Sequence, residues 1–424
     1  MRVLLVSGNR EEIDIRVPAL GLACIAASAE AAGHEVQLLD LLISKDPETS
    51  VAEAVSSFRP GVIGVSVRNI DDQRMRNPKF LLEQAREAVG WCRKVSSAPI
   101  VLGGAGFSIL PQPVLEYLGA DMGIQGEGEV LFPELLKRMQ GRGHVEEMPG
   151  LFLKGKAQPA RRTFTKELDS LPLPDPSLLA RSLSGAKEAP VPVQTRRGCP
   201  LSCSYCSTPT IEGKTVRRRS PEAVISWMAR CVDEGFRNFY FVDNTFNLPP
   251  SYAMNICSKI VAAGLDISWT CILFPGTLDP KLAELLEKSG CGEVSIGFES
   301  GAENMLHRMR KQYALGEVRR TCDLLQQHHI RRMGFLLLGG PGETRESVDA
   351  SLSFAEELDL DALKVSIGVR IYPNTDVSRQ AAKEGLIGSD QDLLKPTFYL
   401  AKEVEGWIYD AVEQRLSVKP HWSF

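Results

Sequence analysis

The sequence has no excess of positive charge, no long apolar run and few cysteines. Across 424 residues, 49 Lys and Arg oppose 53 Asp and Glu, and this balance argues against a large nucleic-acid surface, which needs clustered positive charge. The longest stretch of small apolar residues, Pro18–Gly33, is interrupted by Glu30 and is too short to span a membrane. Ten cysteines in this length do not make a disulfide scaffold. We therefore predict a cytoplasmic protein with no transmembrane segment and no nucleic-acid partner.

The length and the alternation of β-rich and helical segments predict two α/β domains. Residues 1–140 alternate short strands with helices at a spacing typical of a doubly wound, Rossmann- or flavodoxin-like parallel sheet. Residues 141–190 include the proline-rich run LPLPDPSLL and predict an extended, non-helical linker. The alternation restarts at residue 191 and continues to 385 in six strand–helix units, which predicts a partial (β/α)6 barrel of the TIM type. Residues 386–424 are predicted to form a short helical tail that packs against the barrel.

The segment at residues 194–207, QTRRGCPLSCSYCS, spaces three cysteines as C-x3-C-x2-C: Cys199, Cys203 and Cys206. Gly198 and Pro200 favour a tight loop that turns the three thiols towards one point. Soft thiolates favour an iron–sulfur cluster or zinc. A structural zinc site needs a fourth Cys or His at short spacing, whereas the next such residues are Cys231 and His307. The motif therefore favours a cluster in which one iron keeps open coordination positions.

With Tyr205 directly before its last cysteine, this motif resembles the cluster loop of the radical S-adenosylmethionine superfamily. The resemblance implies a 4Fe-4S cluster held by the catalytic cysteines Cys199, Cys203 and Cys206. In that family the open iron chelates the methionine moiety of S-adenosylmethionine, and an electron from the cluster cleaves the cofactor to a 5′-deoxyadenosyl radical. An electron donor such as flavodoxin or ferredoxin is implied as a partner.

Polar residues and glycines follow several predicted strands of the region 191–385. By resemblance to the superfamily, the residues implied to bind S-adenosylmethionine are Tyr205, Asp243, Glu299, Ser300, Gly339, Gly340 and Arg370. For the strand-end residues, the alternative interpretation is a helix N-cap or a turn. Basic residues flank the cluster loop and are predicted either to hold an anionic group or to form a solvated face: Arg196, Arg197 and Arg217–Arg219.

Glycine-rich loops follow two predicted strands of the first domain, GGAGFS at 103–108 and GEGE at 126–129. Glycine lets the backbone approach a large flat ligand, although ordinary tight turns are the alternative. Together with the pattern Pro18, Gly21, Leu22, Ala26 and the turn Ala32–Glu35, these loops resemble the cobalamin-binding domains fused in front of radical S-adenosylmethionine domains. The residues implied to contact cobalamin are Ser7, Arg68, Asn69, Gly103, Gly104, Ala105, Gly106, Phe107, Gly126, Glu127 and Gly128.

One departure from the cobalamin-binding pattern concerns the lower face of the cobalt. Many such domains carry D-x-H-x-x-G, whose histidine ligates cobalt, and this chain lacks that motif. Arg68 and Asn69 are our candidates for contacts near that face instead. The alternative for Arg68 is a salt bridge with Asp71 or Asp72.

The combined resemblance implies a cobalamin-dependent radical S-adenosylmethionine enzyme. Methylation of an unactivated carbon is the most common chemistry of that family, and we predict a small-molecule or lipid-like substrate contacted by Tyr372 and Tyr399. A first alternative is cobalamin-assisted radical cyclisation, rearrangement or ring contraction without methyl transfer. Methylthiotransfer to tRNA is disfavoured, since it usually needs three further cysteines and the first domain has only Cys24 and Cys92. A non-catalytic cobalamin or redox sensor is the remaining alternative.

Overall fold

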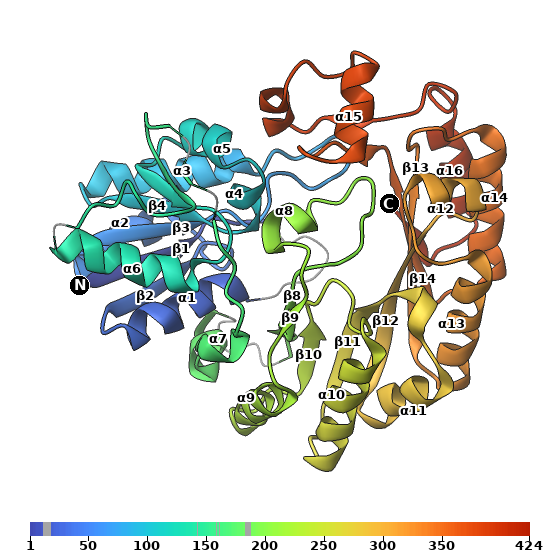
Figure 1. Cartoon of the computed structure of the whole chain (residues 1–424), viewed down its shortest axis with the longest axis horizontal. Coiled ribbons are helices and arrows are strands. Elements are labelled where there is room, and N and C mark those ends of the chain that lie inside the picture. The colour runs from blue at the N-terminus through green and yellow to red at the C-terminus, as the bar shows by residue number, and fades with distance from the viewer. Residues whose placement is uncertain (12–17, 142, 158, 161, 183–187) are drawn as a thin grey trace.

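The computed structural model describes residues 1–11, 18–141, 143–157, 159–160, 162–182 and 188–424. Two α/β sheets, one from each half of the chain and parallel except for one edge strand of the first, face each other across a central region that contains the short helix α8 (Thr208–Glu212) (Figure 1). The predicted fold class is therefore confirmed. Among the helices of the described ranges, none is both long and apolar enough to cross a membrane.

The first sheet has the strand order β2-β1-β3-β4-β5-β6, and β6 alone runs antiparallel to its neighbour. Its strands are β1 (Arg2–Ser7), β2 (Glu35–Asp40), β3 (Val62–Ser66), β4 (Ile100–Gly103), β5 (Met122–Ile124) and β6 (Leu151–Leu153). Its helices are α1 (Leu20–Ala31), α2 (Pro47–Phe58), α3 (Leu82–Val95), α4 (Ala105–Ile109), α5 (Pro111–Leu118) and α6 (Gly128–Gly141). Helix α1 packs beside α6, and α2 and α5 pack beside α3. Helices cover both faces of the sheet, so the central strands β1 and β3 are almost entirely apolar and buried.

The segment between the sheets is more regular than the sequence indicated. Strand β6 lies inside the predicted linker and pairs with β5, so we propose that the first domain extends to about residue 153 and not to 140. The prediction of a non-helical connector is wrong for Pro176–Ser182, which form helix α7. Pro176 is the first residue of α7, where a fixed φ and a missing amide hydrogen cost a helix little. A short 3-10 turn, Leu168–Ser170, precedes it.

The second sheet is parallel throughout and has the order β17-β14-β13-β12-β11-β10-β7. Six of its strands are the predicted ones: β7 (Val191–Val193), β10 (Asn238–Phe241), β11 (Ser268–Leu273), β12 (Cys291–Glu299), β13 (Arg331–Leu338) and β14 (Ala362–Ile367). Their helices are α9 (Pro221–Asp233), α10 (Pro250–Ala262), α11 (Pro280–Lys288), α12 (Glu303–Arg308), α13 (Leu315–Gln327), α14 (Arg345–Glu357) and α15 (Asp376–Lys383). The sheet curves as a partial barrel with α9, α10, α11, α13 and α14 on its outer side (Figure 1). This architecture confirms the predicted six units.

The C-terminal tail packs against the barrel, as predicted. Helix α16 (Ile408–Leu416) lies beside α14, and the unpredicted strand β17 (Trp422–Ser423) pairs in parallel with β14. Two short antiparallel pairs complete the fold: β8 (Arg196–Arg197) with β9 (Arg217–Arg218), and β15 (Val369–Arg370) with β16 (Phe398–Tyr399). The first of these pairs closes the base of the cysteine loop.

Candidate functional site

The three motif cysteines line one hollow of about 670 Å3 at the carboxyl ends of the barrel strands. We call it the cluster hollow, and its lining includes Cys199, Cys203, Tyr205, Cys206, Glu299 and Lys311. The loop turns at Gly198, whose φ of +87° is strained for other residues. A Cβ atom there would lie 2.2 Å from the carbonyl oxygen of Thr215, so the predicted need for glycine is confirmed.

The donor set of this loop fits an iron–sulfur cluster better than a single ion. In the part of the chain that the structure describes, no three His, Cys, Asp or Glu side chains converge closely enough to hold one metal ion. The three thiols are unbonded and line a common space, which suits a group of several irons. Burial raises the pKa of Cys199 to about 11 and also raises that of Cys203, although the Lys311 ammonium opposes the change at Cys203. Cluster binding therefore entails release of the thiol protons.

Glu299 and Lys311 place opposite charges in the wall of the cluster hollow. Glu299 ends β12 at a register irregularity and has a φ of +61°, a conformation that non-glycine residues adopt chiefly where the surroundings impose it. Gly297 makes room for it, because a Cβ atom there would lie 2.8 Å from Glu299 Oε1. The Lys311 ammonium lies 3.0 Å from Glu299 Oε1 and 5.2 Å from the centre of the Tyr205 ring.

This pair of charges matches the zwitterionic end of an amino acid. Burial is the largest single effect on the pKa of Lys311 and by itself would lower it. The charge of Glu299, with smaller contributions from the groups around it, outweighs burial and holds that pKa well above its usual value. The Glu299 carboxylate can then bind the amino group of a methionine moiety, and the Lys311 ammonium can bind its carboxylate. The ligand would thereby replace the ion pair between the two side chains. Glu299 and Tyr205 line the cluster hollow, and their contact with S-adenosylmethionine stays a prediction, whereas no prediction was made for Lys311 from the sequence. Only its position a few residues after the predicted strand end could have indicated it.

We expect Lys311→Met to weaken S-adenosylmethionine binding about tenfold or more, because it removes one partner of a buried charge pair. Equilibrium binding to the cluster-loaded protein would measure the change. Lys288→Met is the matched control, since Lys288 pairs with Glu284 on the exposed surface of α11. Equal affinities for both variants would contradict a role of Lys311 in holding the cofactor.

The side chains of two predicted S-adenosylmethionine contacts form hydrogen bonds inside the protein. Asp243 is buried and accepts hydrogen bonds from the Thr195 backbone N–H (2.9 Å), the Thr195 hydroxyl (2.5 Å) and the Arg196 N–H (3.2 Å). Ser300 is fully buried, with its hydroxyl 2.9 Å from that of Ser351. Neither residue lines the cluster hollow. Both follow strands as predicted, but their side chains point into the protein.

Gly339 and Gly340 also lie outside the lining of the cluster hollow. The N–H of Gly339 donates to Glu343 Oε2 (3.2 Å), and the N–H of Glu343 donates to the carbonyl of Gly340 (3.0 Å). The predicted glycine turn is therefore present, and its backbone forms hydrogen bonds with the buried Glu343. Gly340 and Tyr205 both line a separate small cavity, so this turn lies near the cysteine loop but outside the cluster hollow.

Arg370 joins the two halves of the molecule. Its Nε donates to Asp71 Oδ2 (2.7 Å), and its other nitrogens donate to backbone carbonyls of Ile371, Leu393 and Thr397. Both side chains of the pair are buried and Arg370 does not line the cluster hollow, so the guanidinium is engaged inside the protein, and its contact with S-adenosylmethionine stays a prediction. The alternative interpretation of Arg68 is a salt bridge with Asp71 or Asp72, and among the ion pairs of the described residues none joins Arg68 to either carboxylate.

The two tyrosines predicted to contact substrate lie in different surroundings. Tyr372 is buried, and the central carbon of the Arg370 guanidinium lies 5.1 Å from the centre of the Tyr372 ring. Burial raises the pKa of the Tyr372 hydroxyl. The Tyr399 hydroxyl donates to Glu384 Oε1 (3.0 Å), and its pKa is raised to about 12 by burial first and by that carboxylate. Neither tyrosine lines the cluster hollow. Their roles towards a substrate remain predictions.

A second cavity, of about 910 Å3, opens at the carboxyl edge of the first sheet. We call it the glycine-lined cavity. Its floor is apolar and includes Leu5, Val65 and Leu102, and six predicted cobalamin contacts form its rim: Gly103, Gly104, Ala105, Gly126, Glu127 and Gly128. Beyond Gly103, no atom lies within 4 Å of the position that a Cβ would take, so the backbone presents open space to a ligand. This cradle fits the tail of a large cofactor such as cobalamin.

Other predicted cobalamin contacts lie outside the lining of the glycine-lined cavity. Phe107 is fully buried, stacks edge-on against Phe152 and covers Gly123, so it belongs to the core. Gly106 lies in the short helix α4, where we had predicted a loop, and Ser7 is buried at the end of β1. The cavity is also lined by residues that were not predicted to contact cobalamin, among them Ile25, Ser66, Ser108 and Phe132. Ser66 is detectable in principle, because it ends strand β3 beside the glycine loop.

Arg68 and Asn69 follow β3 and do not line the glycine-lined cavity itself. The crowding of protein atoms around the Arg68 guanidinium lowers its pKa, and the neighbouring Tyr240 and Asp40 oppose this shift. Tyr240 belongs to β10 of the second sheet, so Arg68 reaches towards the other half of the molecule. Part of the side chain remains accessible to solvent. A position near the lower face of cobalt remains a prediction for both residues.

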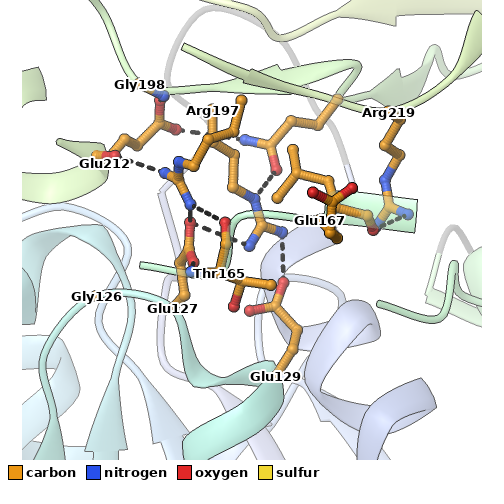
Figure 2. A network of polar contacts seen from close by, with 12 residues as sticks. Gly126, Glu127, Glu129, Thr165, Glu167, Arg197, Gly198, Glu212 and Arg219 are labelled. Carbon is orange, nitrogen blue, oxygen red and sulfur yellow. Dashed lines mark hydrogen bonds and ion pairs between the residues drawn. The ribbon is translucent and has the colours of Figure 1, made fainter. Parts of the chain in front are cut away.

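The basic residues beside the cysteine loop form a buried network with the GEGE loop (Figure 2). Arg197 pairs with Glu129 and lies 3.7 Å from Glu127, and Arg217 pairs with Glu127. Burial is the largest single effect and alone would lower the pKa of Arg197, but the charge and hydrogen bond of Glu129 together with the charge of Glu127 outweigh it and raise that pKa. The alternative of a solvated face is thus wrong for these arginines, and Glu127 faces protein cations as well as the glycine-lined cavity.

Comparisons with known proteins agree with this arrangement. The B12 binding domain family matches residues 7–136 and the Radical SAM superfamily matches residues 193–355. An uncharacterised methyltransferase of Pyrococcus horikoshii is 28% identical over 398 residues, which cover 91% of this chain and 84% of the relative. Tryptophan 2-C-methyltransferase of Streptomyces laurentii is 24% identical over 442 residues, which cover 89% of this chain and 74% of the relative.

A solved structure has the same fold over the whole chain. The radical S-adenosylmethionine methyltransferase TsrM from Kitasatospora setae, with cobalamin and a [4Fe-4S] cluster bound, aligns with a TM-score of 0.88 at 21% identity. The alignment covers 100% of this chain and 92% of that one. With a cobalamin-binding domain in front of a radical S-adenosylmethionine domain, and a fitting cavity in each, the chain belongs to the cobalamin-dependent radical S-adenosylmethionine enzyme family.

Proposed function

We propose that the protein methylates an unactivated carbon of a small-molecule or lipid-like substrate, with a 4Fe-4S cluster, S-adenosylmethionine and cobalamin as its cofactors. The observation that carries the proposal is a shared wall between the two cavities. Four residues of the segment 194–212 line the glycine-lined cavity: Gln194, Arg197, Ile211 and Glu212. Residues between them line the cluster hollow: Cys199, Leu201, Cys203, Tyr205, Cys206 and Thr208.

The chain's own residues bind and orient these groups. When bound, the three cofactors supply an electron, a methyl group and a carrier for that methyl group. The three cysteines would hold the cluster, Glu299 and Lys311 would orient the methionine end of S-adenosylmethionine, and the glycine rim would seat cobalamin. A site enclosed between two domains excludes water, which reactive carbon radicals require.

Methyl transfer is the reaction in the names of both relatives described above, and the substrate in one of those names is tryptophan, a small molecule. Two other relatives are named as cyclases, which keeps cyclisation as the first alternative. Methylthiotransfer finds no support in the site, because Cys24 and Cys92, the two cysteines of the first domain, are both buried in its core. They belong to helices α1 and α3 and do not form a second cysteine loop.

The test is transfer of an isotopically labelled methyl group. The protein, with both cofactors bound under anaerobic and reducing conditions, is incubated with S-adenosylmethionine carrying a deuterated methyl group and a panel of amino-acid and lipid-like substrates. We expect a product that has gained the labelled methyl group, detected by mass spectrometry. Turnover without labelled product would instead support cyclisation, rearrangement or ring contraction. Cofactor binding without any turnover across the panel would favour a sensor.

A further inference from the structure

The wall between the two cavities contains a carboxylate that contacts both sides. Glu212, the last residue of α8, lines the glycine-lined cavity, and its Oε2 accepts the backbone N–H of Gly198 (3.1 Å). The same oxygen accepts a hydrogen bond from Asn244 Nδ2 (2.9 Å), and Asn244 Oδ1 accepts a hydrogen bond from the Thr208 hydroxyl (3.3 Å). Asn244 and Thr208 line the cluster hollow. A continuous chain of hydrogen bonds therefore connects the linings of the two cavities.

Arg197 makes a second connection through the backbone. It lines the glycine-lined cavity and is held there by Glu129, Glu127 and the side chain of Gln194 (2.9 Å) (Figure 2). Only Gly198 separates it from Cys199 in the sequence. Arg217 extends this connection, because it pairs with Glu127 and donates to the carbonyl of Glu212 (2.7 Å).

These contacts have a thermodynamic consequence. Fixing the cysteines around a cluster also fixes Gly198, and with it the positions of Arg197 and Glu212 at the rim of the other cavity. A ligand in the glycine-lined cavity then meets an already ordered wall, so less conformational entropy is lost when it binds. By linkage, a ligand in that cavity favours the loop geometry that the cluster requires by the same factor.

We propose that Glu212 and Arg197 are positioning residues that couple the two cofactor sites, so that cobalamin and the iron–sulfur cluster each strengthen the binding of the other. This inference rests on the proposed use of both cofactors. A coupling of ordinary strength between two such sites corresponds to roughly a tenfold change in affinity.

The experiment measures the dissociation constant of cobalamin for the full-length protein with and without its cluster, by the change in cobalamin absorbance under anaerobic conditions. We expect the cluster-loaded protein to bind cobalamin about tenfold more tightly. In the reciprocal measurement, saturating cobalamin slows the removal of iron by a chelator. Neither readout depends on turnover.

Variants distinguish this coupling from a general effect on folding. The two carboxylate oxygens of Glu212 accept from three donors: the Gly198 N–H, the Asn244 amide and the Gln194 amide. Glu212→Gln keeps the volume of the side chain but removes the charge and turns one of these two acceptors into a donor, and we expect the affinity ratio to fall to about threefold or less. Asp71→Asn is the matched control. It weakens another buried ion pair that joins the two halves, at Arg370, and neither residue of that pair lines either cavity. It should leave the ratio near that of the unmodified protein.

Each outcome decides between the claims. Equal cobalamin affinity with and without the cluster overturns the coupling but leaves the proposed function intact. A ratio that falls in Asp71→Asn as much as in Glu212→Gln also overturns it, because domain docking in general would then be responsible. If Glu212→Gln does not fold, chelator protection by cobalamin in the unmodified protein decides the question. Failure to bind cobalamin at all overturns both this inference and the proposed function.

Discussion

Cys206→Ala is expected to abolish turnover, with a loss of about a thousandfold or more, because the change removes one of the three thiolates available to hold the cluster. The variant should contain little iron and sulfide after anaerobic reconstitution, and it should form no 5′-deoxyadenosine from S-adenosylmethionine. The thiol is only half-buried and packs no core, so we expect the variant to remain folded. Iron analysis, the visible absorption spectrum and product detection measure the effect.

Cys231→Ala is the control for this prediction. Cys231 is buried in α9 and lies outside the linings of the cluster hollow and the glycine-lined cavity. Its loss should cost stability through a small packing defect but leave the iron content unchanged. A Cys206→Ala protein that still formed 5′-deoxyadenosine would refute the assignment of the cluster to this loop.

Gly103→Val is expected to weaken cobalamin binding about a hundredfold, because the new side chain would occupy the space in which the cofactor is seated. Gly103 ends strand β4, lines the glycine-lined cavity and has no atom within 4 Å of the position of a Cβ. Valine is a favourable strand residue, so the fold should tolerate it. A titration of the variant with cobalamin, followed by absorbance, measures the loss.

Gly90→Ala gives a matched control for Gly103→Val. Gly90 is exposed in the middle of α3, and no atom lies within 4 Å of the position of a Cβ there either. Alanine should stabilise this helix by about 1 kcal/mol and leave cobalamin binding unchanged. If Gly103→Val bound cobalamin as tightly as Gly90→Ala, the glycine-lined cavity would not be the cobalamin site.

The elements of both sheets were predictable because each strand and helix buries a continuous apolar surface that local sequence records. Strand β3 reads VIGVS, and α9 begins at Ser220-Pro221, where the serine caps the helix and the proline occupies its first position. Strands β6 and β17 were missed, since two- and three-residue strands at a sheet edge leave too short a pattern. Helix α7 was missed because three prolines in its vicinity favour an extended interpretation.

The functional residues were harder to assign, because a position after a strand does not specify the direction of the side chain. Glu299 turns into the cluster hollow at a backbone irregularity, whereas Asp243 turns inwards and binds Thr195. Arg370 resembled a ligand contact in sequence, but its partner is Asp71, 299 positions away along the chain. Such pairings between distant charges depend on how the two sheets dock.

The sequence by itself determined the cysteine loop, the need for glycine at position 198, and the order of a cobalamin-binding domain and a half-barrel. These features depend on spacing and on local backbone geometry, which neighbouring residues dictate. Only the tertiary structure decided that Arg197 and Arg217 are buried against Glu127 and Glu129, and that one short segment borders both cavities. The physical reason is that a buried charge is stable only beside a partner, and the partners here come from the other domain.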